Sequence, residues 1–238
     1  MSKLLLSLGL LFTSFLHAQD KLIISDPMAV IRDMGKFEKI EIHGPFKVYY
    51  SVSDKCTVAI SAHSESARDR IRVKNNGGVL TIDLENSYRN WISVDGKFKL
   101  YISAPTISEI NASGAVNFLV TDLLKSDDLK IRFTGASDFL GKLDCSKLYL
   151  QCTGASDVEL TGRSADVEAV LTGASKLKAS TFKIENADIR VSGASNSSIA
   201  VSNKLHAVAT GASNIQYFGN PSTIEVSSSG ASKIKRVD

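Results

Sequence analysis

Apolar and polar residues alternate in short segments over residues 106–238, and each segment ends at a Gly-Ala pair. Mainly apolar residues occupy two columns, four and two positions before the glycine. The first column contains Ile110, Ile131, Leu150, Ala169, Ile189, Ala207 and Val226, and the second contains Ala112, Phe133, Cys152, Leu171, Val191, Ala209 and Ser228. Such alternation is typical of a β-strand, because successive side chains point to opposite faces. The pattern predicts one strand before every Gly-Ala pair.

A second strand is predicted after each pair. The residues four positions after the glycine are Phe118, Phe139, Val158, Leu177, Ser197, Ile215 and Ile234. Those six positions after it are Val120, Gly141, Leu160, Ala179, Ile199, Tyr217 and Arg236. Each unit therefore reads as a strand, a tight turn, a second short strand and a connector.

The Gly-Ala pairs define an internal repeat. The repeated glycines are Gly114, Gly135, Gly154, Gly173, Gly193, Gly211 and Gly230, spaced 21, 19, 19, 20, 18 and 19 residues apart. Six of the seven copies read Gly-Ala-Ser. A unit of about 19 residues is too short for a strand with a packed helix or for a four-stranded propeller blade. We therefore predict an all-β fold, a parallel β-helix (solenoid) whose rungs, the single turns of the coil, stack at about 4.8 Å around one core.

The Gly-Ala-Ser turn is interpreted as a structural corner. The glycine is expected where the backbone needs a positive φ or a close approach, and the alanine where a larger side chain does not fit. A hydroxyl residue directly precedes every glycine. We expect these hydroxyls to form hydrogen bonds along the stack and to turn amides.

Residues 35–105 are also strand-like but lack the Gly-Ala-Ser signature. Strands are predicted at residues 40–42, 48–52, 58–62, 71–73 and 79–84, with a hairpin turn at Asn75-Asn76-Gly77-Gly78. One helical turn is expected between His63 and Arg70. We interpret this region as irregular first rungs or a β cap, so that residues 35–238 form one β-helix domain with Gly-Ala-Ser rungs over 106–238.

Residues 1–18 have the features of a signal peptide: Lys3, an apolar run and the small residue Ala18 before the expected cleavage site. The mature chain then begins with a leader segment, residues 19–34. No other stretch approaches the roughly 20 apolar residues of a membrane-spanning helix. The sequence therefore predicts an exported protein without a transmembrane anchor.

Composition and charge exclude some functions. The chain is 43% hydrophobic and 22% charged, which is enough for a folded core. Its net charge of +3 lacks the concentrated basic charge of a nucleic-acid-binding protein. Cys56, Cys145 and Cys152 show no zinc-ligand or Cys-x-x-Cys spacing, and Cys152 falls in an apolar column. No cofactor motif or metal site is predicted.

Two sets of residues are candidates for function. Arg132, Gln151 and Arg190 lie between the apolar columns, so they point outward and are candidate binding residues. Asp138 and Asp157, each three positions after a glycine, are expected on adjacent rungs about 5 Å apart, a separation compatible with a retaining glycosidase. The alternative is that both aspartates simply favour a turn.

Aromatic residues near the amino terminus admit two interpretations. Tyr49, Tyr50, Tyr88 and Trp91 are candidates for stacking on sugar rings in an exported protein. Packing in the core or in a cap is the favoured interpretation, because aromatic side chains bury large apolar areas.

The order of these features resembles one known family. The features are a signal peptide, the Asn-Gly-Gly turn before Val79-Leu80-Thr81-Ile82, residues 94–105 leading to Ile110-Asn111-Ala112-Ser113-Gly114-Ala115, and serial Gly-Ala-Ser rungs. Residues 35–238 resemble the putative auto-transporter adhesin, head GIN domain family. The resemblance implies a single-stranded right-handed β-helix, export from a Gram-negative bacterium to the periplasm, the outer-membrane surface or the medium, and no catalytic residues.

The expected function is therefore that of a non-enzymatic cell-envelope protein. An adhesin would present the solenoid surface to a glycan or a surface protein. Two alternatives stay open at this point: a carbohydrate-active β-helix enzyme, and a periplasmic scaffold without a ligand.

Overall fold

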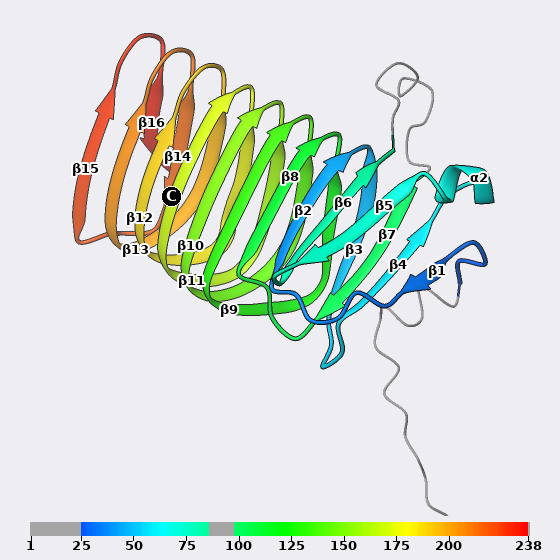
Figure 1. Cartoon of the computed structure of the whole chain (residues 1–238). Coiled ribbons are helices and arrows are strands. Elements are labelled where there is room, and N and C mark those ends of the chain that lie inside the picture. Colours follow the sequence, from blue (N-terminus) through cyan, green and yellow to red (C-terminus); the bar gives the residue numbers. More distant parts are fainter. Residues whose placement is uncertain (1–24, 86–97, 238) are drawn as a thin grey trace, which may run out of the picture.

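The computed structural model describes residues 25–85 and 98–237, and most of them lie in strands that coil into a solenoid (Figure 1). The predicted signal peptide and the first part of the predicted leader lie outside the described residues. In chain order the strands are β1 (Val30–Arg32), β2 (Lys39–Gly44), β3 (Phe46–Val52), β4 (Thr57–Ser61), β5 (Ile71–Asn76), β6 (Val79–Leu84), β7 (Phe98–Ala104), β8 (Glu109–Gly114), β9 (Asn117–Gly135), β10 (Asp138–Gly154), β11 (Asp157–Gly173), β12 (Lys176–Val191), β13 (Asn196–Ala209), β14 (Asn214–Phe218), β15 (Thr223–Ser228) and β16 (Lys233–Arg236).

The Gly-Ala-Ser rungs stack in parallel. Each of β9 to β13 pairs with the next one along the chain, and β13 pairs with both β14 and β15. The two short strands predicted for each rung are joined in β9 to β13 into one long strand that bends halfway. The fold is thus the predicted parallel β-solenoid, with about seven turns.

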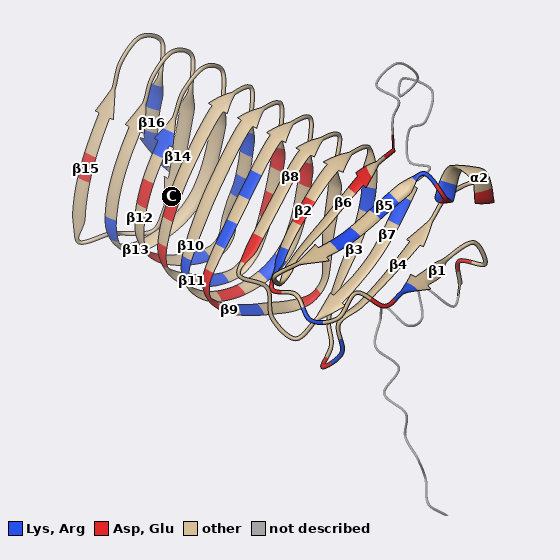
Figure 2. Ribbon diagram, in the orientation of Figure 1, with Lys and Arg blue, Asp and Glu red and all other residues tan. Residues whose placement is uncertain are grey.

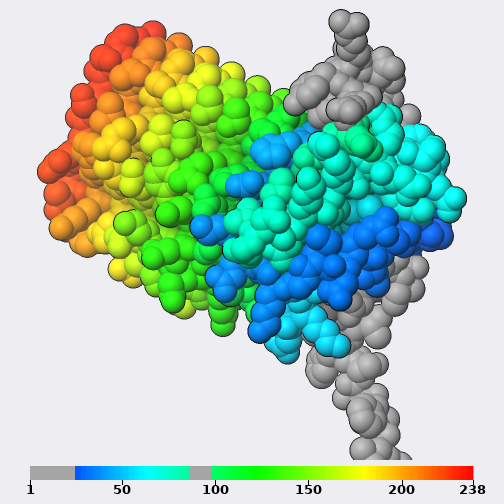
Figure 3. Space-filling model, viewed as in Figure 1, coloured from blue at the N-terminus to red at the C-terminus, as the bar shows by residue number. Residues whose placement is uncertain are grey.

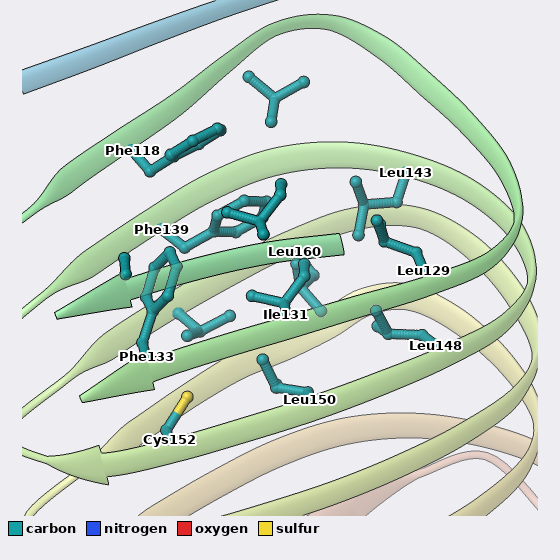
Figure 4. Close-up of a cluster of buried hydrophobic side chains, with 14 of the residues drawn as sticks. Phe118, Leu129, Ile131, Phe133, Phe139, Leu143, Leu148, Leu150, Cys152 and Leu160 are labelled. Atoms are coloured by element: carbon teal, nitrogen blue, oxygen red, sulfur yellow. The ribbon is translucent and has the colours of Figure 1, made fainter. Parts of the chain in front are cut away.

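The core fills the space between the two faces of the coil (Figure 4). Most residues of the columns predicted to point inward are almost completely buried, as Ile131, Phe133 and Phe139 show with 0–2% exposure. The last rung differs, since Val226 is 51% exposed there. Cys152 belongs to the same core, which confirms its prediction as a core residue. Burying apolar side chains at about 25 cal/mol per Å² supplies the main free energy for the fold.

The repeated glycines form the corners at one edge of the coil. All seven have φ between +75° and +107°, a region that favours glycine. They also lie directly on one another: a Cβ on Gly173 would be 2.5 Å from the carbonyl oxygen of Gly154, closer than real Cβ contacts. Glycine is therefore needed here for both conformation and space.

The neighbours of the corner glycines differ from the sequence prediction. The repeated alanines, such as Ala136 and Ala174, are exposed, so a lack of space does not explain them. The serine that follows each alanine is buried instead in five rungs, at Ser137, Ser156, Ser175, Ser195 and Ser213. The backbone at the positive-φ glycine turns the chain so that this serine, and not the alanine, points inward.

The buried serines bond one rung to the next. The Ser195 hydroxyl donates to the carbonyl oxygen of Gly173 at 3.3 Å and accepts from the amide of Ser175 at 3.1 Å. The predicted contact between hydroxyls that precede the glycines occurs between Thr172 and Thr153, at 3.3 Å. Since a buried hydroxyl without a partner is costly, the serine ladder stabilises a fixed register at this edge.

Two further rungs precede the repeat, and they stack out of chain order. Strands β2 and β3 pair with β8 and β9, and Gly44, with φ of +135°, lies against Gly114 as another corner glycine. Strands β6 and β7 then pair with the other edges of β2 and β3. The predicted hairpin is confirmed: β5 and β6 are antiparallel around Gly77 and Gly78, which both have positive φ.

Antiparallel strands cover this amino-terminal end. Strand β4 pairs with β7, β1 pairs with β4, and the predicted helical turn is α2 (Glu65–Arg68) (Figure 1). From Ser25 onward the predicted leader therefore lies on the sheet.

The Asp26 carboxylate of the leader accepts hydrogen bonds from Tyr101 at 2.7 Å, Ser61 at 3.0 Å and Lys99 at 3.2 Å. Burial acts to raise the pKa of Asp26, but these hydrogen bonds outweigh it and hold the pKa below its usual value.

Candidate functional site

Arg132, Gln151 and Arg190 lie on one face of the solenoid, as outward residues of β9, β10 and β12. Arg132 and Gln151 are neighbours on adjacent rungs, and Val170 separates Gln151 from Arg190. Two positions before this column runs a second outward column, formed by Glu109, Lys130, Tyr149, Glu168, Asp188 and His206. We call the surface formed by these two columns, from Glu109 to His206, the mixed-charge face.

An ion pair and an aromatic ring organise one end of the mixed-charge face. The Arg132 guanidinium binds the Glu109 carboxylate and also lies over the Tyr149 ring, with its carbon 5.3 Å from the ring centre. Lys39 is 3.6 Å from the same carboxylate. Burial acts to raise the pKa of Glu109, but hydrogen bonds from Asn111 and Arg132 outweigh it and keep the pKa low. This end thus holds a fixed anion, a cation and a ring.

A second charged cluster lies toward the carboxyl-terminal end of the same face. The Asp188 carboxylate is 3.0 Å from the Arg190 guanidinium and 3.2 Å from the His206 ring. About two-fifths of each side chain is exposed, so all three remain available to a ligand while they orient one another. Exposed pairs of this kind contribute little to stability, at most about 1 kcal/mol.

The mixed-charge face is broad and shallow. Positive and negative residues are interspersed along its rungs (Figure 2), and the space-filling view shows successive rungs forming one continuous wall (Figure 3). One hollow of about 450 Å³ lies around Arg132 and Tyr149, and another of about 320 Å³ around Asp188 and His206. Such a surface suits an extended ligand that is held by several polar contacts.

Asp138 and Asp157 lie on the opposite face. They are direct neighbours on adjacent rungs, at the starts of β10 and β11, and both are exposed. Parallel strands are about 4.8 Å apart, so the predicted juxtaposition occurs. Within residues 25–85 and 98–237 there is no group of three or more His, Cys, Asp or Glu side chains that could hold a metal ion.

A hollow of about 730 Å³ follows the edge where the long strands bend. Lys125, Asp144, Arg163 and Lys183 form a column of charges along it. Asp144 and Arg163 share two hydrogen bonds of 2.9 and 3.0 Å, and the bonds from Arg163 hold the pKa of Asp144 below its usual value. Beneath them, burial raises the pKa of the Cys145 thiol.

The aromatic candidates near the amino terminus pack against the protein where they are described. Tyr50 is completely buried and donates to the carbonyl oxygen of Ala104 at 3.0 Å. Tyr49 stacks on Tyr101, with ring centres 5.3 Å apart. These contacts confirm packing for both residues, whereas Tyr88 and Trp91 lie outside the described residues.

Sequence reasoning missed Glu109, Tyr149, Asp188 and His206. The signal was present, because these residues stand two positions before the outward column that contains Arg132 and Arg190. In a strand, residues two apart share a face. Extending the alignment by one more column would have placed them beside the predicted residues.

None of the helices in the described part of the chain is long and apolar enough to cross a membrane. The fold and the two outward faces define a β-solenoid with an extended surface. Comparison with family models matches residues 36–221 to the family described as putative auto-transporter adhesin, head GIN domain. The chain belongs to this family, as its sequence features predicted.

Solved structures share the fold. A putative adhesin from Bacteroides fragilis is 22% identical, with a TM-score of 0.80 over 88% of this chain and 96% of that one. A putative adhesin from Parabacteroides merdae is 20% identical, with a TM-score of 0.70 over 88% and 95%. A protein from Parabacteroides distasonis described as a putative lipid binding protein is 19% identical, with a TM-score of 0.70 over 90% and 97%. Comparison with curated proteins finds no match.

Proposed function

We propose that this protein is an exported, non-enzymatic adhesion module that binds a surface glycan through the mixed-charge face. Membership in an adhesin family supports adhesion in general. The observation that carries the proposal is the composition of this face: partly exposed Arg, Gln, Asp and His side chains, with the Tyr149 ring among them, on the rungs from β9 to β13. Sugar rings offer hydroxyls to such planar polar groups and an apolar side to the aromatic ring.

The shape of the face supports binding rather than catalysis. Its hollows around Tyr149 and His206 are shallow surface features, whereas catalytic carboxylates usually act in a cleft that excludes water. Asp138 and Asp157, the candidate pair for glycoside hydrolysis, lie on the other face, where both are exposed. Export is proposed from the sequence of residues 1–18.

A glycan array tests the proposal with the mature chain and two double variants. The first variant, Gln151→Ala with Arg190→Ala, removes an amide and a guanidinium from the mixed-charge face. The control, Asn117→Ala with Arg163→Ala, removes the same two groups from the opposite face and the bend. We expect the wild type and the control to retain a common set of glycans, and the first variant to lose at least about tenfold in affinity for them, or about 1.4 kcal/mol.

Two results would contradict the proposal. In one, the wild type binds no glycan on the array. In the other, both variants bind with wild-type affinity, which would place the ligand elsewhere on the molecule.

A further inference from the structure

Four lysines frame a rectangle on the face opposite the mixed-charge face. Lys176 and Lys178 point outward from the start of β12, and Lys233 and Lys235 point outward from β16. Three rung steps separate the two pairs, or about 14 Å, and two residues within a strand span about 7 Å. We call these four residues the lysine frame.

Neutral polar side chains form the floor of the frame. The strand register aligns Lys176 with Asn196, Asn214 and Lys233 in one column. It aligns Lys178 with Ser198, Gln216 and Lys235 in the next column. A hollow of about 410 Å³ lies over these residues. The frame therefore combines cations at its corners with amides and a hydroxyl at its centre.

Three of the four lysines form no ion pair within the described part of the chain, although Asp157 is the neighbour of Lys176 on the preceding rung. Lys178 is 3.5 Å from Glu159 on the preceding rung. Lys176, Lys233 and Lys235 have no carboxylate within 4.0 Å among the residues that the structure describes. The two central amides hold each other in place, because the Asn214 side chain donates to that of Asn196 at 3.1 Å. The two lysines of each pair are about 7 Å apart and repel each other, and an anionic ligand would relieve this repulsion.

We propose that the lysine frame is a binding site for an acidic polysaccharide, with carboxylate or sulfate groups held at its corners and sugar hydroxyls held by Asn196, Asn214, Gln216 and Ser198. The flat, extended floor fits a chain of sugars. No aromatic residue lines the hollow, whereas binding of a single-stranded nucleic acid uses aromatic stacking. Anchoring in a lipid surface relies on exposed apolar groups, and the outward residues of the frame are all polar.

This site is separate from the mixed-charge face and does not depend on the function proposed for it. The two can be tested separately, because no residue belongs to both. If both bind, the protein can hold two segments of glycan on opposite faces, and the combined binding would exceed that of either site alone.

The test measures binding of the mature chain to heparin, polygalacturonate and neutral dextran by surface plasmon resonance. The frame variant replaces Lys176, Lys178, Lys233 and Lys235 by Gln. A control variant of equal net charge replaces Lys74, Lys125, Lys142 and Lys183 by Gln, none of which lines the hollows of the frame or of the mixed-charge face. We expect binding to at least one acidic polysaccharide but not to dextran, a loss of tenfold or more in the frame variant and less than threefold in the control. All eight lysines are exposed, so both variants should fold, and circular dichroism checks this.

Other outcomes overturn the proposal. Equal losses in the two variants would mean that binding reflects net charge alone. Absence of binding to both acidic polysaccharides would leave the frame without its proposed ligand. Tighter binding to phosphatidylglycerol vesicles or to single-stranded DNA than to either polysaccharide would assign the lysines to a different partner.

Discussion

The two edges of the solenoid differ in how regularly successive rungs are in register. At the glycine edge, Gly44, Gly114, Gly135, Gly154 and the later glycines stack directly, so the register is constant from rung to rung. Near the bend edge the register shifts. The repeat of 21 residues is two longer than the next. Its two extra residues lie between Leu119 and Leu123 of β9, opposite Leu140 and Lys142 of β10. A further shift lies between Glu159 and Gly162.

This difference shows which residues of the repeat the fold requires and where the length of a rung can vary. The repeated Gly-Ala-Ser residues form an edge where neighbouring backbones stack closely at every rung and where buried hydroxyls need partners. Differences in rung length are absorbed near the other edge, where charged residues line an open hollow. A regular spacing of residues within one chain can therefore mark a structural corner. The outward residues proposed to bind a ligand need not repeat.

The largest expected effect is at the glycine edge. In Gly173→Ala, the new Cβ would lie 2.5 Å from the Gly154 carbonyl oxygen at a φ of +86°. We expect a loss of roughly 2–4 kcal/mol in the free energy of unfolding, from strain and overpacking together. Gly77→Ala is the control, since Gly77 has φ of +59° but nothing within 4 Å of an added Cβ. Urea unfolding should show a clearly smaller loss there, and equal losses would refute the contact between stacked glycines.

The serine ladder should show the next largest effect. Ser195→Ala removes a buried hydroxyl that donates to Gly173 and accepts from Ser175. The expected cost is about 1–3 kcal/mol, because the buried Ser175 amide loses its partner, whereas the Gly173 carbonyl keeps its bond from the Ala194 amide. Ser192, on the other side of Gly193, is partly exposed, so Ser192→Ala should change the thermal midpoint much less. Equal midpoints for the two variants would show that the ladder does not stabilise the corner.

Insertion of one glycine tests the tolerance of the bend. Placed between Ser146 and Lys147, at the bend of β10, it should cost about 1 kcal/mol, since one extra residue resembles a β-bulge. The same glycine placed between Gly135 and Ala136 should be far more damaging, because it displaces a stacked corner. Thermal unfolding of the two insertion variants compares the edges directly, and similar midpoints would remove the distinction between them.

The smallest expected effect is a change in stability at low pH, which should occur at the bend edge and not at the glycine edge. The pKa of Asp144 is lower in the folded protein than in the unfolded chain, so its contribution to stability is present at neutral pH and is lost as the pH falls below about 4. The small destabilisation expected for Asp144→Asn should therefore be smaller at pH 3 than at pH 7. The destabilisation of Ser195→Ala should stay constant, because that corner has no titratable group. Thermal midpoints at both pH values measure the difference.

The strands, the corner glycines and the hairpin could be predicted because each leaves a local signal in the sequence. Gly44 was missed because it is followed by Pro45 and Phe46 in place of Ala and Ser. The stacking of β6 and β7 beyond β2 and β3 follows from contacts far apart in the chain, which periodicity does not record. The alanine was assigned the wrong role, and the burial of the serine after it was not predicted, because a positive-φ glycine breaks the alternation on which the alignment relied.

The candidate site was predictable only in part, because alternation gives the direction of a side chain but not its partner. The outward direction of Arg132 and Arg190 follows from alternation alone. Their pairing with Glu109 and Asp188, however, depends on which side-chain rotamers meet across and along rungs. The lysine frame depends on the register between β12 and β16, which differences in rung length obscure in the sequence.

The central claim is that this solenoid is an adhesion module at the cell surface, and protease treatment of intact cells tests it most directly. Cells that produce the protein are treated with a protease that cannot pass the outer membrane, and the mature chain is followed by immunoblot beside a periplasmic control protein. The account predicts that the mature chain is lost while the control survives. Survival of the chain until the outer membrane is broken would contradict adhesion and indicate a periplasmic protein.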